Sequence, residues 1–232
     1  MKPANEFVAG IVAGNQALFE ASKSNVKAYF ESIPDQASLI EHFTGRMVNE
    51  RMNMTEISRA ISSMPADTPA EELELLAKQA QDEARHFRMV KEVIEHITGK
   101  EIDVNEAIAR EAAKPTAKGA DLLVKYNAQD DEAALAAYQL VAEGRAEAVW
   151  DQMADSIEDK FISTRYAKIA RDEGFHATLG ARKLAKIAID ADTQARVIDL
   201  VDRMRKDLYD VSCKNTTTTE DGAKLIADAY GW

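Results

Sequence analysis

The segment Asp82-Glu83-Ala84-Arg85-His86 decides how the whole sequence is interpreted, and a second version of it stands at Asp172-Glu173-Gly174-Phe175-His176. Each segment places Glu-x-x-His inside a long stretch of helical periodicity. Residues three apart on a helix lie on the same face, one turn apart. Each segment therefore presents a carboxylate and an imidazole together, which predicts half of a two-metal site in a four-helix bundle.

A complete site of this kind needs one more glutamate from each of two further helices. Glu50 and Glu143 fit this requirement, because each stands where an apolar residue is expected in a stripe of helical spacing. The predicted metal ligands are Glu50, Glu83, His86, Glu143, Glu173 and His176. Two divalent ions would balance the four carboxylates. Oxygen ligands with one nitrogen per metal favour two iron ions, or a manganese–iron pair, with dioxygen as co-substrate.

Hydrophobic periodicity and capping signals predict an all-α protein made of one domain, residues 1–232. The core bundle is expected over about 36–188. Shorter helical pieces are expected between 100 and 129, broken by Pro115 and Gly119, with one piece capped by Asp103. The long helices are predicted at about 36–63, at 69–98 with Thr68 as N-cap, Pro69 as first residue and Gly99 as the stop, at about 130–159, and at 160–188. The predicted flanking helices are 5–31 at the N-terminus and 193–213 and 219–229 within the C-terminal region 193–229.

The composition is that of an ordinary globular protein, with 46% hydrophobic and 30% charged residues. A net charge of −11 disfavours nucleic acid and anionic membrane as partners. Cys213 is the single cysteine, so the chain can build no disulfide framework, iron–sulfur cluster or rubredoxin-type module by itself. The first residues lack the pattern of a secretory signal. We therefore expect a cytoplasmic protein.

The paired Asp-Glu-x-x-His motifs, with Glu50 and Glu143, resemble those of ferritin-like di-iron carboxylate proteins over residues 36–188. Asp82-Glu83-Ala84-Arg85-His86 is similar to the motif of bacterial multicomponent monooxygenases, whereas the size and helix spacing resemble aldehyde-deformylating oxygenase. The resemblance implies a ferritin-like four-helix bundle with a dinuclear metal centre. It also implies that Asp82 accepts a hydrogen bond from His176 and Asp172 from His86, which would orient the ligating rings. Arg85, like these two aspartates, is expected to lie next to the metal ligands without binding the metals.

Three other features near the motifs bear on function. Val90 stands four residues after His86, where a reductase-type radical tyrosine would be expected, so a radical generator is disfavoured. Glu147, one turn after Glu143, is the candidate catalytic residue. It is open whether it is an extra ligand, a proton donor or a carboxylate tolerated near the site. Gly144 and Gly174 indicate room for substrate, a local helix distortion or close helix packing.

The predicted function is a non-haem dinuclear iron oxygenase, an oxidoreductase of the monooxygenase type, that oxidises a small, largely apolar organic molecule. Electrons would come from a separate ferredoxin, flavoprotein reductase or co-substrate. Metal oxidation and storage, or peroxide detoxification as in ferritins and rubrerythrins, is the alternative, and a metal-free structural bundle is a third. The sequence leaves open the substrate, the metal pair and whether the chain forms a homodimer.

Overall fold

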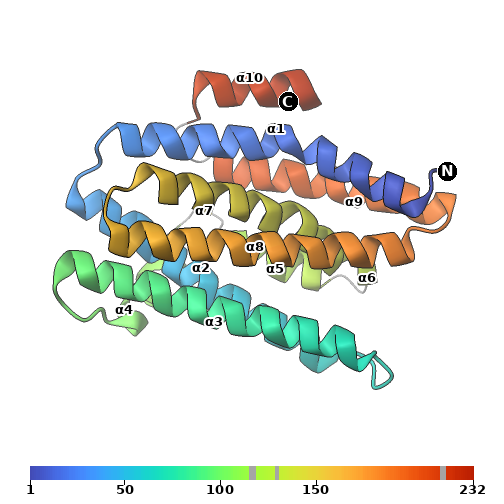
Figure 1. Ribbon diagram of the computed structural model, residues 1–232, viewed down its shortest axis with the longest axis horizontal. Coiled ribbons are helices and arrows are strands. Elements are labelled where there is room, and N and C mark those ends of the chain that lie inside the picture. The colour runs from blue at the N-terminus through green and yellow to red at the C-terminus, as the bar shows by residue number, and fades with distance from the viewer. Residues whose placement is uncertain (115–118, 129–130, 215–217) are drawn as a thin grey trace. The chain divides into compact units, whose positions relative to one another are not determined.

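The computed structural model describes residues 1–114, 119–128, 131–214 and 218–232 (Figure 1). All regular structure in these ranges is helical, which confirms the all-α class. The chain divides into two compact units. One unit combines Met1–Ser32 with Lys125–Trp232, and the other is Ile33–Val124. Along the described ranges, no helix has the length and hydropathy that a membrane span requires.

The unit Ile33–Val124 is built on a hairpin of two long helices, α2 (Gln36–Ser63) and α3 (Ala70–Thr98), which run side by side (Figure 1). A short helix, α4 (Val104–Ala112), packs against α2. A further helix, α5 (Gly119–Asn127), begins in this unit and ends in the other. The long hairpin fixes which turns of α2 and α3 face each other, and so it positions the glutamates that these helices carry.

Local capping explains where these helices begin and end. Asp35 accepts a hydrogen bond from the Ser38 amide at 2.8 Å at the start of α2, and Asp103 caps α4 in the same way, as predicted. Gly99 ends α3 with φ = 66°, a left-handed conformation that glycine adopts without a Cβ clash. The prediction of Thr68 as N-cap was wrong. Its amide bonds the Pro65 carbonyl in a turn, and Pro69 takes the N-cap position instead.

The other unit packs long helices on one another, and α10 lies along α1 in it (Figure 1). Its long helix α8 packs against α6, η1 and α7. The elements of this unit are α1 (Ala4–Glu31), α6 (Glu132–Tyr138), the π-helix η1 (Gln139–Glu143), α7 (Gly144–Ser156), α8 (Lys160–Ile187), α9 (Ala191–Leu208), the π-helix η2 (Tyr209–Lys214) and α10 (Glu220–Tyr230).

The helix predicted over 130–159 differs from the observed one. Asp131 caps its first turn by accepting from the Ala133 amide, and the helix ends at Ser156 rather than at Asp159. It also contains the π-helical turn η1, which the sequence pattern did not predict. The predicted start at Asp130 and the predicted break at Pro115 lie outside the described residues.

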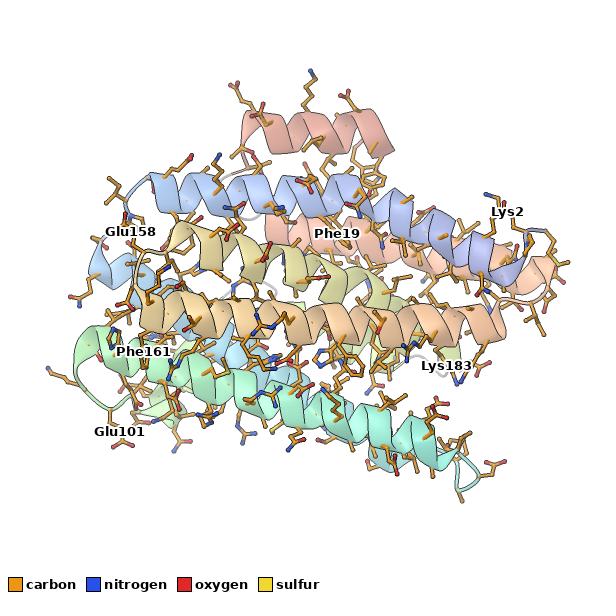
Figure 2. The ribbon with its side chains drawn as sticks, in the orientation of Figure 1. Lys2, Phe19, Glu101, Glu158, Phe161 and Lys183 are labelled. Carbon is orange, nitrogen blue, oxygen red and sulfur yellow. The ribbon has the colours of Figure 1, made fainter. Side chains whose placement is uncertain are left out.

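Two glycines mark where helices of this unit approach most closely. A Cβ added to Gly180 on α8 would lie 2.3 Å from the Ala136 carbonyl oxygen, so the two backbones are almost in contact. A Cβ on Gly144 would lie 2.9 Å from the ring of Phe19 on α1 (Figure 2). For Gly144, close helix packing is therefore sufficient to explain the glycine.

The N-terminal and C-terminal helices of the unit are joined by polar contacts. Arg205 on α9 is buried and donates to the Asn15 side chain and to the Ile11 carbonyl on α1. The Tyr230 hydroxyl on α10 donates to the Gly14 carbonyl at 2.5 Å. These bonds satisfy buried polar groups while fixing α9 and α10 against α1.

Candidate metal centre

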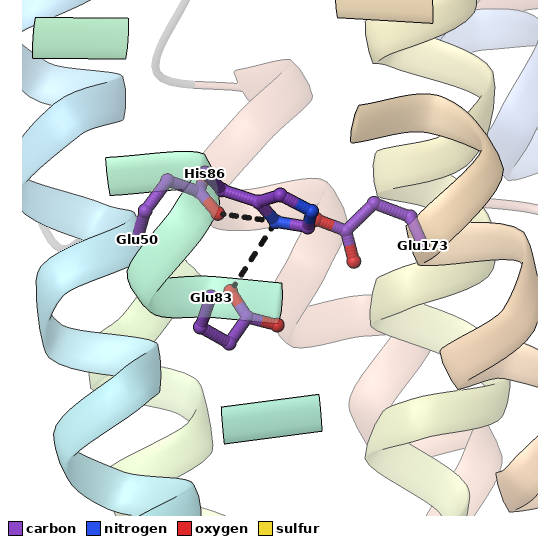
Figure 3. A group of neighbouring side chains, drawn as sticks. All are labelled: Glu50, Glu83, His86 and Glu173. Carbon is purple, nitrogen blue, oxygen red and sulfur yellow. Dashed lines mark ion pairs between the residues drawn. The ribbon is translucent and has the colours of Figure 1, made fainter. Parts of the chain in front are cut away.

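The unit Ile33–Val124 brings three of the predicted ligands together. Glu50 comes from α2, and Glu83 and His86 come from adjacent turns of α3. All three are at most 2% exposed. His86 Nδ1 lies 3.5 Å from Glu50 Oε2 and 3.8 Å from Glu83 Oε2 (Figure 3). Each residue offers one ligand atom, and these atoms lie within 4.8 Å of one another. We call these three residues the α2–α3 half-site.

The other unit gathers the remaining three ligands in the same way. Glu143 is the last residue of η1, and Glu173 and His176 lie one turn apart on α8. All three are at most 2% exposed, and their ligand atoms also lie within 4.8 Å of one another. His176 Nδ1 lies 3.1 Å from Glu173 Oε2. We call these residues the η1–α8 half-site.

The donor atoms of each half-site suit a divalent cation. Each offers two carboxylates and one imidazole, a ligand set that binds iron and manganese well. Removing a carboxylate from water costs several kcal/mol unless a cation or strong hydrogen bonds compensate it. Two buried carboxylates around one imidazole carry a charge that one divalent ion would neutralise. Buried Glu and His clusters of this composition could therefore hold metal ions.

The orientation of the histidines agrees with a role as ligands. In both half-sites Nδ1 is the ring nitrogen that faces the carboxylates. This leaves Nε2 of His86 and His176 for an acceptor that fixes the ring, as metal-bound histidines usually require.

Asp82 and Asp172, the residues predicted to supply those acceptors, are both buried, so neither is an ordinary exposed helix acid. Asp82 pairs with Lys78 and Arg85, and Asp172 pairs with Lys168. Arg85 and Lys78 therefore balance the negative charge of Asp82, which directly precedes the predicted ligand Glu83. The predicted hydrogen bonds from the histidines each join residues of different units and stay predictions.

The π-helical turn η1 ends at Glu143, one of the predicted ligands. A π-turn inserts an extra residue into a helix and rotates the residues after it, and such turns occur frequently at functional sites. Of the two glycines that indicated a possible local distortion, Gly144 comes directly after η1. The distortion itself lies just before the glycine, over Gln139–Glu143.

Glu147 lies beside the η1–α8 half-site without belonging to either cluster of ligand atoms in the described residues. It is exposed as a residue, but its carboxylate reaches Gly174. A Cβ on Gly174 would lie 2.6 Å from Glu147 Oε1. Partial burial raises the pKa of Glu147, and the nearby charges of Asp151 and Glu173 add to this effect. The space that Gly174 leaves open is therefore filled by this carboxylate.

The two histidines without the motif, His42 and His96, lie outside both clusters in the described part of the chain. His42 on α2 has its pKa lowered to about 3, because burial disfavours the cation and Arg46 adds a positive charge. His96, in the last turn of α3, is exposed. Trp150 and Tyr166 are fully buried and meet edge to face with ring centroids 4.9 Å apart, an ordinary arrangement for core aromatics.

The sequence pattern did not predict several buried polar groups on α2 and α3, the helices that carry three of the predicted ligands. On α2, Met54 and Ile61 continue an apolar pattern of helical spacing but are only partly buried, whereas Asn53 and Glu56 are buried. On α3, Gln79 is fully buried one turn before Glu83. For Asn53 and Gln79, the spacing of three residues from Glu50 and four from Glu83 was the available signal, since it places them on the faces of these glutamates. Glu56, six residues after Glu50, carried no such signal.

No protein-family model, curated protein or solved structure matches this chain.

Proposed function

We propose that the two half-sites combine into one dinuclear metal centre inside a ferritin-like four-helix bundle, and that the protein is a non-haem iron oxygenase. The observation that carries the proposal is the duplicated ligand set. Each unit contributes two glutamates and one Nδ1-facing histidine, all at most 2% exposed. Neither set completes a coordination sphere alone, and together they form the ligand inventory of a di-metal carboxylate bundle.

Charge supports the same conclusion. Four buried carboxylates carry −4, which two divalent ions balance while the imidazoles remain neutral. Bound iron would supply the reduction of dioxygen and the oxidation of a small organic substrate, with electrons from an external reductase or co-substrate. The chain's own residues hold the ligands in place and exclude water from around them. Two iron ions, or a manganese–iron pair, match the oxygen-rich ligand set.

Glu147 is the residue we propose for proton transfer. Its carboxylate lies beside Gly174, the residue that follows the proposed ligand Glu173 in the sequence. Glu147 itself stands four residues after the proposed ligand Glu143. A carboxyl group at this position can carry a proton between solvent and the site, because the residue itself is exposed.

Metal analysis tests the centre first. Purified protein loaded with ferrous iron under anaerobic conditions should retain two irons per chain, and after oxidation the pair should be spin-coupled and silent in EPR. Strong signals from isolated ferric ions would show that the half-sites bind metal separately. Glu83→Ala and Glu173→Ala, one in each half-site, should each lose metal. Glu71→Ala, on an exposed position of α3, should not.

Oxygen consumption then tests the reaction. The reduced protein should consume dioxygen faster when its substrate is present, and iron uptake should stop at two per chain. Uptake of iron far beyond two per chain would refute the oxygenase proposal and favour storage. A protein that purifies and refolds without any stoichiometric transition metal would refute both.

A further inference from the structure

Asn53 is a buried polar residue that the metal centre does not use. It lies on α2 three residues after Glu50 and is 3% exposed. Its side-chain oxygen is buried and accepts no hydrogen bond within the described residues. Buried polar atoms without partners are rare in folded proteins and cost free energy, so each one calls for an explanation.

Other side-chain amide oxygens in the chain do find donors. Asn49, one turn before Asn53 on α2, accepts from the Ala120 amide at 2.8 Å and so fixes the start of α5. Asn15 accepts from Arg205, and Gln194 accepts from the Lys2 amide. The contrast with Asn49 is the sharpest, because both residues belong to the same helix. The packing of this unit thus satisfies one asparagine and leaves its neighbour with an open acceptor.

The position of Asn53 relative to the ligands is set by helix geometry. Three residues of α-helix advance about 4.5 Å along the axis, so Asn53 lies one turn beyond Glu50 toward the end of α2. In the antiparallel partner α3, the buried Gln79 lies one turn beyond Glu83 in the same direction. Both side chains therefore border the α2–α3 half-site on its side nearer residues 64–69.

We propose that the Asn53 side-chain oxygen binds the hydrogen-bond donor of an organic substrate, so that the oxygenase acts on a small alcohol, amine or amide. The substrate class rests on the proposed oxygenase function, whereas the binding of a hydrogen-bond donor at Asn53 does not. A buried acceptor favours a hydroxyl or N–H group and disfavours a carboxylate or ketone, whose oxygen would face the Asn53 oxygen. A site that hydrogen-bonds its substrate strongly rejects analogues without the matching group.

Binding of chain-matched probes tests the proposal by calorimetry on the iron-loaded protein. The donors are n-hexanol, n-hexylamine and hexanamide, and the acceptor-only controls are hexanoate and methyl butyl ketone. Wild-type protein should bind the donors about tenfold more tightly than the controls. Asn53→Leu should remove this preference while leaving the binding of the controls unchanged. Equal binding of donors and controls by the wild type, or no binding of any donor, would overturn the proposal.

Thermal stability separates a binding role from a structural one. Without probe, Asn53→Leu should raise Tm, because it replaces an unsatisfied buried amide by an apolar group of similar shape. Asn49→Leu is the matched control and should lower Tm, because the Ala120 amide loses its acceptor. A lower Tm for Asn53→Leu with unchanged donor preference would make Asn53 a structural residue. If Asn53→Leu does not fold, Asn53→Asp keeps the acceptor and should still bind n-hexylamine.

The iron content of each variant keeps the two proposals apart. Asn53→Leu should retain two irons per chain, since Asn53 is outside both clusters of ligand atoms in the described residues. Donor preference in a protein that never binds two irons would refute the proposed oxygenase and leave the binding site standing. Two irons without any donor preference would refute the binding site alone.

Discussion

Gly180→Ala adds a side-chain carbon where the backbones of two helices lie very close together, in the unit that carries Glu143 and His176. An added Cβ would lie 2.3 Å from the Ala136 carbonyl oxygen and 2.6 Å from the Leu140 amide nitrogen. Ordinary contacts of a Cβ begin near 3.4 Å, so α8 must move about 1 Å away from α6 and η1. The atoms it meets are backbone, which no side-chain rotation can relieve.

The net cost is the difference between two opposing effects. Over-packing of a tight interior costs about 1–3 kcal/mol, and backbone contacts place this site at the upper end. Alanine gains about 1 kcal/mol over glycine in a helix interior. The free energy of unfolding should therefore fall by about 2 kcal/mol. For a chain of 232 residues, this lowers Tm by roughly 4–8 °C.

The same substitution at Gly10 is the matched control. Gly10 lies on an exposed face of α1, and a Cβ there would meet only the Lys2 ammonium at 4.0 Å. Gly10→Ala should therefore keep the helix gain of about 1 kcal/mol and raise Tm. Differential scanning calorimetry of both variants against wild type gives the comparison directly.

The metal site should respond to Gly180→Ala as well. Gly180 lies one turn after His176 and contacts η1, which ends at Glu143. Moving α8 away from η1 separates these two ligands, so iron content should fall below two per chain, whereas Gly10→Ala should retain both irons. If Gly180→Ala were as stable as Gly10→Ala and bound iron normally, the inferred close contact and its role in positioning Glu143 would be refuted.

Three further substitutions test other parts of the structure. Glu147→Gln should keep two irons per chain but slow substrate-coupled oxygen consumption about 100-fold, and loss of an iron would instead make Glu147 a ligand. His42→Gln should remove part of the acid sensitivity. The native pKa of His42 is about 3 against 6.5 in the unfolded chain, so its contribution to stability is complete above pH 6.5 and is lost as the pH falls toward 3. At pH 5 this loss is about 2 kcal/mol in the free energy of unfolding. Urea unfolding at pH 5 and pH 8 measures this, with the exposed His96→Gln as control, and an unchanged pH dependence would contradict the buried neutral state. Tyr230→Phe removes a hydrogen bond to the α1 backbone and should cost about 1 kcal/mol, and an unchanged Tm would show that this bond does not hold α10.

The sequence alone predicted the long helices and the Glu-x-x-His pair of each half-site. Capping by Asp35 and Asp103 and the glycine stop at Gly99 are local effects, because each bond closes within a few residues. Glu83 and His86 share a face for the same reason, since helical periodicity fixes it without reference to any other segment. Glu50 and Glu143 are buried, as their positions in apolar stripes predict. A residue inside such a stripe lies on the helix face that packs against the core.

The features that depend on distant segments follow from tertiary packing. Three such features are the π-turn that ends at Glu143, the contact of Gly180 with Ala136, and the burial of Asn53 in place of Met54. They arise from how helices pack, and packing depends on side-chain volumes in several helices at once. The same packing places the Glu147 carboxylate against Gly174. The six clustered Glu and His residues could thus be predicted from spacing, whereas the residues that surround them could not.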